Sequence, residues 1–144
     1  MPQMIDSPIL TDADHKFLEQ FHNSGLGNTV GFSHREHVRL AWEVMSGRGL
    51  VEGLEMITRL ISGIAQAQGD SLRYHETLTL FWGRIVHHAI QTRPDLGSFD
   101  DLLAHFPFLL EKGLPIRHWS AGTLWANSAR SDWAEPDLRP LPEY

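Results

Sequence analysis

The sequence contains no cysteine at all, and this absence removes several structures and chemistries at once. Disulfides, thiolate metal sites and cysteine nucleophiles all need that sulfur atom, so none of them operates in these 144 residues. Long hydrophobic runs are missing too, because no apolar stretch approaches the roughly 20 residues that span a bilayer. We therefore expect a chain that does not cross a membrane.

Clusters of basic side chains are also missing. The 12 Lys and Arg residues are scattered and are outnumbered by 18 Asp and Glu, which gives a formal net charge of −6 at pH 7. Following a nucleic-acid backbone requires a concentrated basic surface, so we expect no nucleic-acid partner. The first residues contain no basic segment followed by an apolar run, and this pattern predicts a cytoplasmic protein.

What remains has the composition of one ordinary globular domain. With 42% hydrophobic and 21% charged residues, the chain can bury one continuous core. We expect a single domain over 1–144, with extended tails at 1–10 and 134–144. The second tail includes "EPDLRPLPEY", whose three prolines favour an extended path over the surface.

Hydrophobic residues recur at helical spacing along most of the chain, and no stretch alternates convincingly like a strand. The predicted class is therefore all-α, with four main helices in a bundle, a C-terminal helical extension and an extended Pro-rich tail. We expect the main helices over about 12–23, from Ser33 to near 46–49, over about 50–67, and from about 71 or 74 to 92. Shorter helices are expected to open at Ser98 and within 120–133. Ser33 with Glu36 three residues later predicts a capping box, and Ser98 with Asp101 has the same spacing.

Two histidines three positions apart begin the second helix, in "GFSHREHVRLAW" at 31–42. On a helical wheel, His34 and His37 fall on the same side as Val38, which is the side that a core would cover. His75 falls on the apolar arc of the fourth helix. Three inward-facing histidines are thus expected near the N-terminal ends of two helices.

Two interpretations of these histidines stay open. A lone histidine on an apolar face is usually a core residue with a hydrogen-bonded ring, because an unpaired buried polar group costs about 1–3 kcal/mol. One metal site would instead account for all three, since three imidazoles and an open position are typical of catalytic zinc and also suit copper, iron or nickel. In an up-down-up-down bundle the second and fourth helices lie diagonally across the core, and a central ion would have to bridge His34, His37 and His75.

Further candidates surround His75. Glu76 is a candidate catalytic residue, because an adjacent helical position diverges by about 100° and suits a general base better than a second ligand. Its alternative role is that of an acid in the first turn of a helix. His118 fits no motif. The predicted substrate-binding residues are Trp42, Tyr74, Thr79, Phe81 and Trp82, although each of them also suits a core or its own helix.

The segments "FSHREHVRLAW", "RYHETLTLFW" and "ARSDWAEPDLRPLP" together resemble a group of small uncharacterised bacterial all-helical proteins. This resemblance covers most of the chain and implies one intact helical domain, with no activity attached. The three-histidine site is similar to that of DinB-like metal-binding four-helix bundles, in architecture only, because that family spaces its ligands differently along the chain.

Three functions follow as hypotheses. The first is a small metalloprotein that acts as an enzyme on a small organic molecule, with one divalent transition metal at His34, His37 and His75 and with Glu76 moving a proton. The second is a metal-free acid–base tailoring enzyme, such as an isomerase or cyclase, with a hydrophobic pocket. The third is a non-catalytic binding or dimerising module, and a homodimer through the Trp-rich C-terminal segment is compatible with the sequence.

Overall fold

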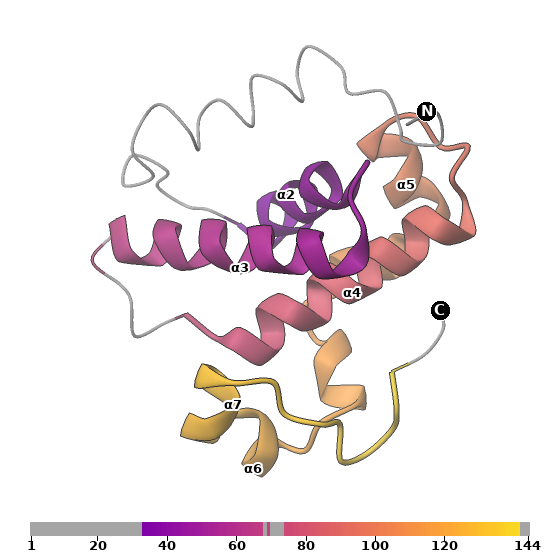
Figure 1. The fold of residues 1–144 in the computed structure, drawn as a ribbon. Helices are drawn as coiled ribbons and strands as arrows, with labels where there is room; N and C mark the ends of the chain where they lie inside the picture. Colours follow the sequence, from indigo (N-terminus) through magenta and orange to yellow (C-terminus); the bar gives the residue numbers. More distant parts are fainter. Residues whose placement is uncertain (1–32, 68, 70–73, 142–144) are drawn as a thin grey trace.

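The structure of the chain is a computed structural model that describes residues 33–67, 69 and 74–141 (Figure 1). Every regular element within these residues is helical, so the predicted all-α class is confirmed. The helix expected at 12–23 and the tail at 1–10 lie outside the described residues. The helices are α2 (His34–Met45), α3 (Leu50–Ala67), α4 (Glu76–Thr92), α5 (Phe99–His105), the 3-10 helices η3 (Pro107–Leu110) and η4 (Leu114–Arg117), α6 (Ala121–Leu124) and α7 (Asn127–Ser131).

The start of α2 is fixed by the capping box that the sequence predicts. The Ser33 hydroxyl accepts a hydrogen bond from the Glu36 backbone N–H, and the Glu36 carboxylate accepts one from the Ser33 N–H (2.6 Å). The helix ends at Ser46, and Gly47 follows with a φ of 81°, a conformation that favours glycine. The two histidines of this helix are therefore held on a defined first turn.

Helices α2, α3 and α4 each contact the other two, and their apolar faces form the core. Trp42 from α2, Ile57 from α3 and Phe81 from α4 are all buried there. The diagonal arrangement of the second and fourth helices, expected for an up-down-up-down bundle, is not present, because α2 and α4 pack directly against each other. Helices α3 and α4 approach each other closely at Gly83. A side chain would not fit there, because a Cβ at this position would lie 2.7 Å from the Leu54 side chain.

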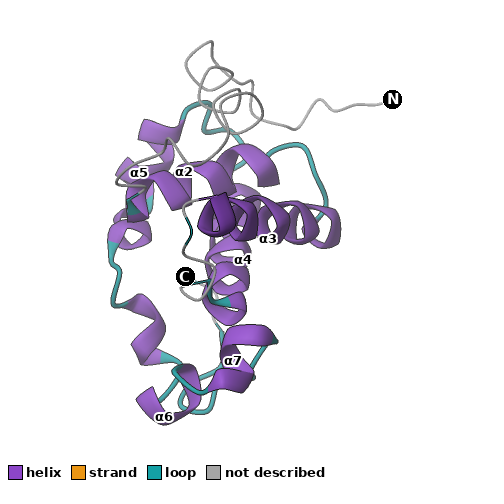
Figure 2. Ribbon diagram, turned by 90° about the vertical axis from the view of Figure 1, so that its left-hand side faces the viewer, coloured by secondary structure: helices purple, strands orange, loops and turns teal. Residues whose placement is uncertain are grey.

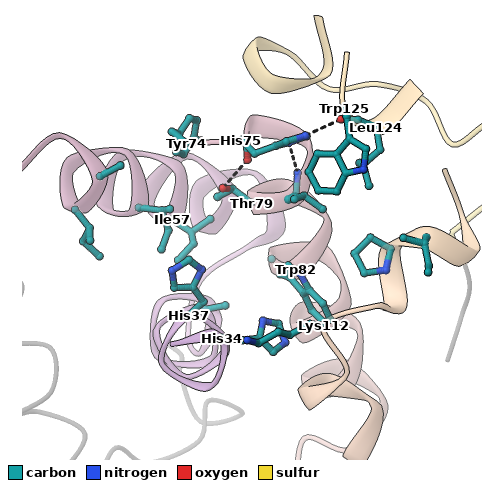
Figure 3. A pocket seen from close by; sticks show the side chains of 18 residues that line it. His34, His37, Ile57, Tyr74, His75, Thr79, Trp82, Lys112, Leu124 and Trp125 are labelled. Carbon is teal, nitrogen blue, oxygen red and sulfur yellow. Dashed lines mark hydrogen bonds between the residues drawn. The ribbon is translucent and has the colours of Figure 1, made fainter. Parts of the chain in front are cut away.

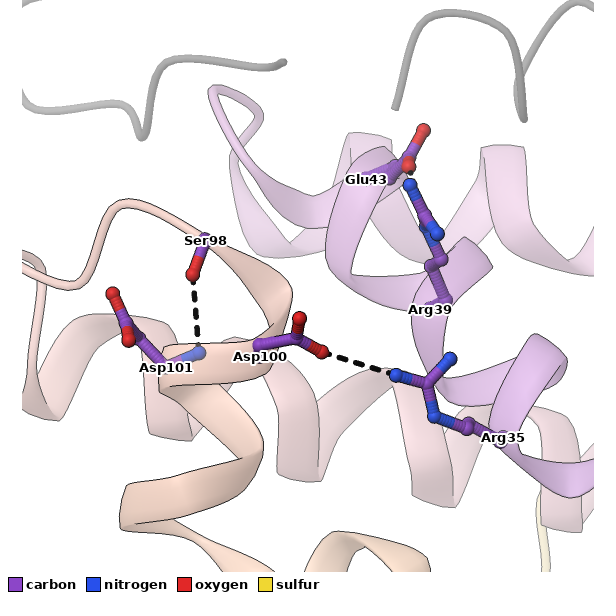
Figure 4. A network of polar contacts seen from close by, with 6 residues as sticks. All are labelled: Arg35, Arg39, Glu43, Ser98, Asp100 and Asp101. Atoms are coloured by element: carbon purple, nitrogen blue, oxygen red, sulfur yellow. Dashed lines mark hydrogen bonds and ion pairs between the residues drawn. The ribbon is translucent and has the colours of Figure 1, made fainter. Parts of the chain in front are cut away.

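Polar contacts attach α5 to the outer side of α2 (Figure 4). Arg35 donates a hydrogen bond to Asp100 (3.1 Å), and its guanidinium lies over the Phe99 ring. Ser98 caps α5 by accepting from the Asp101 N–H, as its spacing from that residue predicts. Figure 1 shows α5 beside the C-terminal end of α4, which precedes it in the chain.

The C-terminal segments lie at the other end of α4, where Figures 1 and 2 both show α6 and α7. The buried Thr77 hydroxyl donates to the Ala129 carbonyl (2.7 Å) and accepts from the Ala134 N–H (3.1 Å). The last described residues have no regular structure, as expected of a Pro-rich tail, and the Leu138 N–H bonds to the His118 carbonyl. Within the described residues, no helix combines the length and apolarity that membrane crossing requires.

Candidate functional site

A cavity of about 570 Å³ opens between α2, α3, α4 and the segment from Lys112 to Trp125 (Figure 3). Its volume lies in the range of roughly 300–1,000 Å³ that small-molecule sites occupy. The three histidines singled out in the sequence all line this cavity: His34, His37 and His75. The structure therefore brings them to one space, although they come from two different helices.

These histidines lie at two ends of the cavity rather than around one point. Figure 3 shows His34 and His37 together at one end and His75 at the other, with Ile57 and Trp82 between them. Across the ranges 33–67, 69 and 74–141, no group of three or more His, Cys, Asp or Glu side chains is arranged to hold a metal ion. The structure does not assemble the predicted three-histidine ligand set.

His75 is the N-cap of α4 rather than a residue within it, with a φ of −137° and a ψ of 109°. Its Nδ1 accepts a hydrogen bond from the Leu78 N–H (3.2 Å), and its Nε2 lies 2.7 Å from the Leu124 carbonyl. Because a backbone N–H only donates and a carbonyl only accepts, the ring must be the neutral Nε2–H tautomer. Both ring nitrogens therefore have partners, as the interpretation of His75 as a core histidine requires.

His34 makes one hydrogen bond through its ring and leaves the other nitrogen basic. Its Nε2 lies 2.9 Å from the Leu109 carbonyl, which can only accept, so the neutral ring carries its proton on Nε2 and a lone pair on Nδ1. The edge of the ring also packs against Trp82, with centroids 4.4 Å apart. Burial lowers the pKa of His34, the Leu109 carbonyl partly opposes this shift, and the Lys112 charge lowers the pKa further.

His37 is the second imidazole at this end of the cavity. Burial lowers its pKa to about 4, and the neighbouring His34 acts in the same direction. Both rings sit near the positive end of the α2 dipole, which also disfavours an imidazolium. At neutral pH the cavity therefore contains two adjacent uncharged imidazoles.

Tyr74 and Thr79 line the cavity, as their prediction as substrate-binding residues requires, but each hydroxyl also has a partner in the protein. Tyr74 donates to the Glu76 carboxylate (2.5 Å), and Thr79 donates to the His75 carbonyl one turn earlier (2.9 Å). Burial is the main reason that the pKa of Tyr74 is raised, and the Glu76 carboxylate raises it further. Glu76 itself is not among the cavity-lining residues. The residue predicted to transfer a proton therefore does not face the cavity in which a substrate would bind.

Two of the predicted substrate-binding aromatic residues do not line the cavity either. Trp42 is buried in the core against Phe99, and Phe81 packs among the rings of Trp82 and Trp119. Among Trp42, Phe81 and Trp82, only Trp82 lines the cavity. The helical wheel predicts that all three are buried but does not distinguish a cavity wall from a filled core.

Sequence reasoning missed the part of the cavity that the C-terminal half supplies. Lys112, Ile116 and Trp125 line it, and the Trp125 ring meets His75 edge-on with centroids 5.6 Å apart. Ile116 lies within η4, and Lys112 and Trp125 come just after η3 and α6. These helices are too short to show a periodicity that would predict the direction of their side chains. His118, for which the sequence suggested no role, is buried beside Phe81 and does not line the cavity.

Comparisons of the chain with protein families, with curated proteins and with solved structures found no match. The resemblance to small bacterial helical proteins and to DinB-like bundles therefore stays a prediction.

Proposed function

We propose that this chain binds a small, largely apolar organic molecule in the cavity and acts on it by proton transfer, without a metal ion, as an isomerase or cyclase does. The observation that carries this proposal is the pair of neutral imidazoles, His34 and His37, at one end of a cavity of about 570 Å³. Neutral imidazoles are the commonest general bases in enzymes, and an apolar site favours their uncharged form.

His34 is the proposed base. Its Nε2–H bond to the Leu109 carbonyl fixes the tautomer and the direction of the ring, which is how bases are oriented in known catalytic sites. The Nδ1 lone pair takes a proton from a carbon or hydroxyl of the substrate, and the carbonyl dipole stabilises the resulting imidazolium. Returning the same proton to a different substrate atom completes an isomerisation, so the step needs no co-reactant.

The metal hypothesis has less support than proton transfer. A metal ligated by His75 would have to displace either the Leu78 N–H or the Leu124 carbonyl, and the first of these bonds caps α4. Without His75, the histidines that line the cavity offer such an ion at most His34 and His37, whereas zinc sites with catalytic function use three protein ligands.

Deuterium exchange tests the proposed chemistry directly. The purified chain is incubated in D₂O with a set of aryl ketones and other weak carbon acids, and mass spectrometry follows deuterium uptake at carbon. We expect catalysed exchange with at least one compound, which is lost in His34→Gln and in Ala65→Trp, whose indole fills the cavity from α3. Ala67→Trp is the matched control, because Ala67 lies on the same helix but outside the cavity. Exchange that survives His34→Gln would contradict the assignment of the base.

Metal content separates this proposal from the metalloprotein hypothesis. Elemental mass spectrometry on untagged protein should give well under one transition-metal ion per chain, in wild type and in His37→Ala alike. Near-stoichiometric metal in wild type that disappears in His37→Ala, but not in the exposed control His105→Ala, would overturn the metal-free proposal.

A further inference from the structure

The cavity lining has an unusual balance of charge. The chain carries 18 Asp and Glu residues against 12 Lys and Arg, yet none of the described residues that line the cavity is Asp or Glu. Lys112 is the one lysine or arginine among these described lining residues. Among the described residues of this acidic protein, the lining of the cavity thus carries a positive charge and no carboxylate.

Lys112 is placed where its charge acts inside the cavity. It lies between η3 and η4, and its ammonium is close enough to His34 to lower the pKa of that ring. Among the described carboxylates, none forms an ion pair with Lys112, whereas its neighbour Glu111 lies 3.8 Å from Arg117. The charge of Lys112 is therefore not neutralised by any described side chain.

Apart from Lys112, the three histidines, Tyr74 and Thr79, the lining of the cavity is apolar. Ile57, Ile61 and Ile64 project into it from successive turns of α3. At the mouth, Ile116 and Trp125 are 62% and 54% exposed, a high degree of exposure for large hydrophobic side chains. Such a surface is stabilised by an occupant with a substantial apolar body.

We propose that the natural ligand of this cavity is a small amphipathic anion, an organic acid with an aromatic or aliphatic body, whose carboxylate pairs with Lys112 while its body lies against the α3 isoleucines. This inference rests on the proposed function, because it names the substrate class of the same cavity. Lys112 is then a specificity-determining residue. It selects the charged ligand over a neutral one of the same shape.

Matched acid and amide probes test this assignment. Binding of 2-naphthoate and of 2-naphthamide is measured by NMR titration at pH 7.5 and low salt. An exposed ion pair contributes up to about 1 kcal/mol, so wild type should bind the acid about fivefold more tightly than the amide. In Lys112→Gln the affinity for the acid should fall to that for the amide. In Lys112→Glu the affinity for the acid should fall below that for the amide. The affinity for the amide should stay the same in both variants. Arg117→Gln, a nearby exposed cation outside the cavity, should leave the preference unchanged.

The outcomes separate this inference from the function on which it rests. Equal affinity of wild type for acid and amide, with signals shifting at the cavity, would overturn the anion assignment and leave the cavity as a neutral-ligand site. A preference for the acid that persists in Lys112→Gln would also overturn it. Binding of neither probe, or binding that Ala65→Trp does not weaken, would overturn both proposals.

Discussion

At the scale of single residues, the same amino acid has three different roles at the cavity. His75 uses both ring nitrogens for structure, His34 uses one, and His37 contributes a ring whose pKa is about 4. The sequence shows that all three face inward, but the hydrogen bonds that distinguish them come from the carbonyls of Leu109 and Leu124, which lie far along the chain. This is why the candidate ligands could be found by helical spacing while their chemistry could not.

Replacing His75 tests its structural role. His75→Ala removes the cap of α4 and leaves the Leu124 carbonyl unpaired, so the free energy of unfolding should fall by about 2–3 kcal/mol. His75→Asn should recover about 1 kcal/mol of this loss, because asparagine can cap the helix. Urea denaturation measures both. If His75→Ala costs no more than His105→Ala, at the exposed end of α5, the capping role is refuted.

The pH dependence of stability tests the buried state of His37. Its pKa falls from 6.5 in the unfolded chain to about 4 in the folded one, so the unfolded chain binds more protons between these values. The contribution of the neutral, buried His37 ring to the free energy of unfolding is present above pH 6.5 and is lost as pH falls towards 4. Wild type should therefore lose about 2 kcal/mol more than His37→Gln between pH 7.5 and 4.5, by urea denaturation at each pH. Identical losses in the two proteins would contradict this account.

At the scale of elements, the sequence predicts the helices well and their arrangement poorly. The predicted span of about 50–67 coincides with α3, and Ser33 and Ser98 cap the helices that their spacing from Glu36 and Asp101 indicates. These features depend on local rules. The direct packing of α2 on α4 depends instead on contacts between distant residues, and His75 gave no sign of capping because histidine is not a preferred N-cap residue.

Thr77 connects α4 to the C-terminal segment, and removing its hydroxyl should weaken the packing of that segment on α4. Its hydroxyl is buried and joins α4 to the Ala129 carbonyl and the Ala134 N–H. Thr77→Val keeps the shape and leaves these groups unpaired, so it should cost about 2–3 kcal/mol of unfolding free energy and speed proteolysis near the C-terminus. Thr92→Val is the matched control, since that exposed hydroxyl bonds only within α4, and it should change stability by under ~0.5 kcal/mol. Equal losses of stability in the two variants would contradict the proposed role of Thr77 in joining α4 to the C-terminal segment.

At the scale of the whole molecule, a small acidic protein has an open cavity between two sets of helices. Three long helices form the core, and the shorter C-terminal helices supply a second wall that carries Lys112 and Trp125. A filled core would be more stable than this arrangement, because open apolar surface forgoes packing. The ligand binding that we propose would account for the open cavity.

The most direct test of that claim is NMR of ¹⁵N-labelled histidine rings at pH 7.5, with and without the tighter-binding of the two naphthalene probes. The account predicts that His34 and His75 are neutral Nε2–H tautomers, and that the probe shifts the signals of His34 and His37 while those of the exposed His105 stay in place. A His34 ring that is protonated, carries its proton on Nδ1, or does not respond to a saturating probe would contradict it.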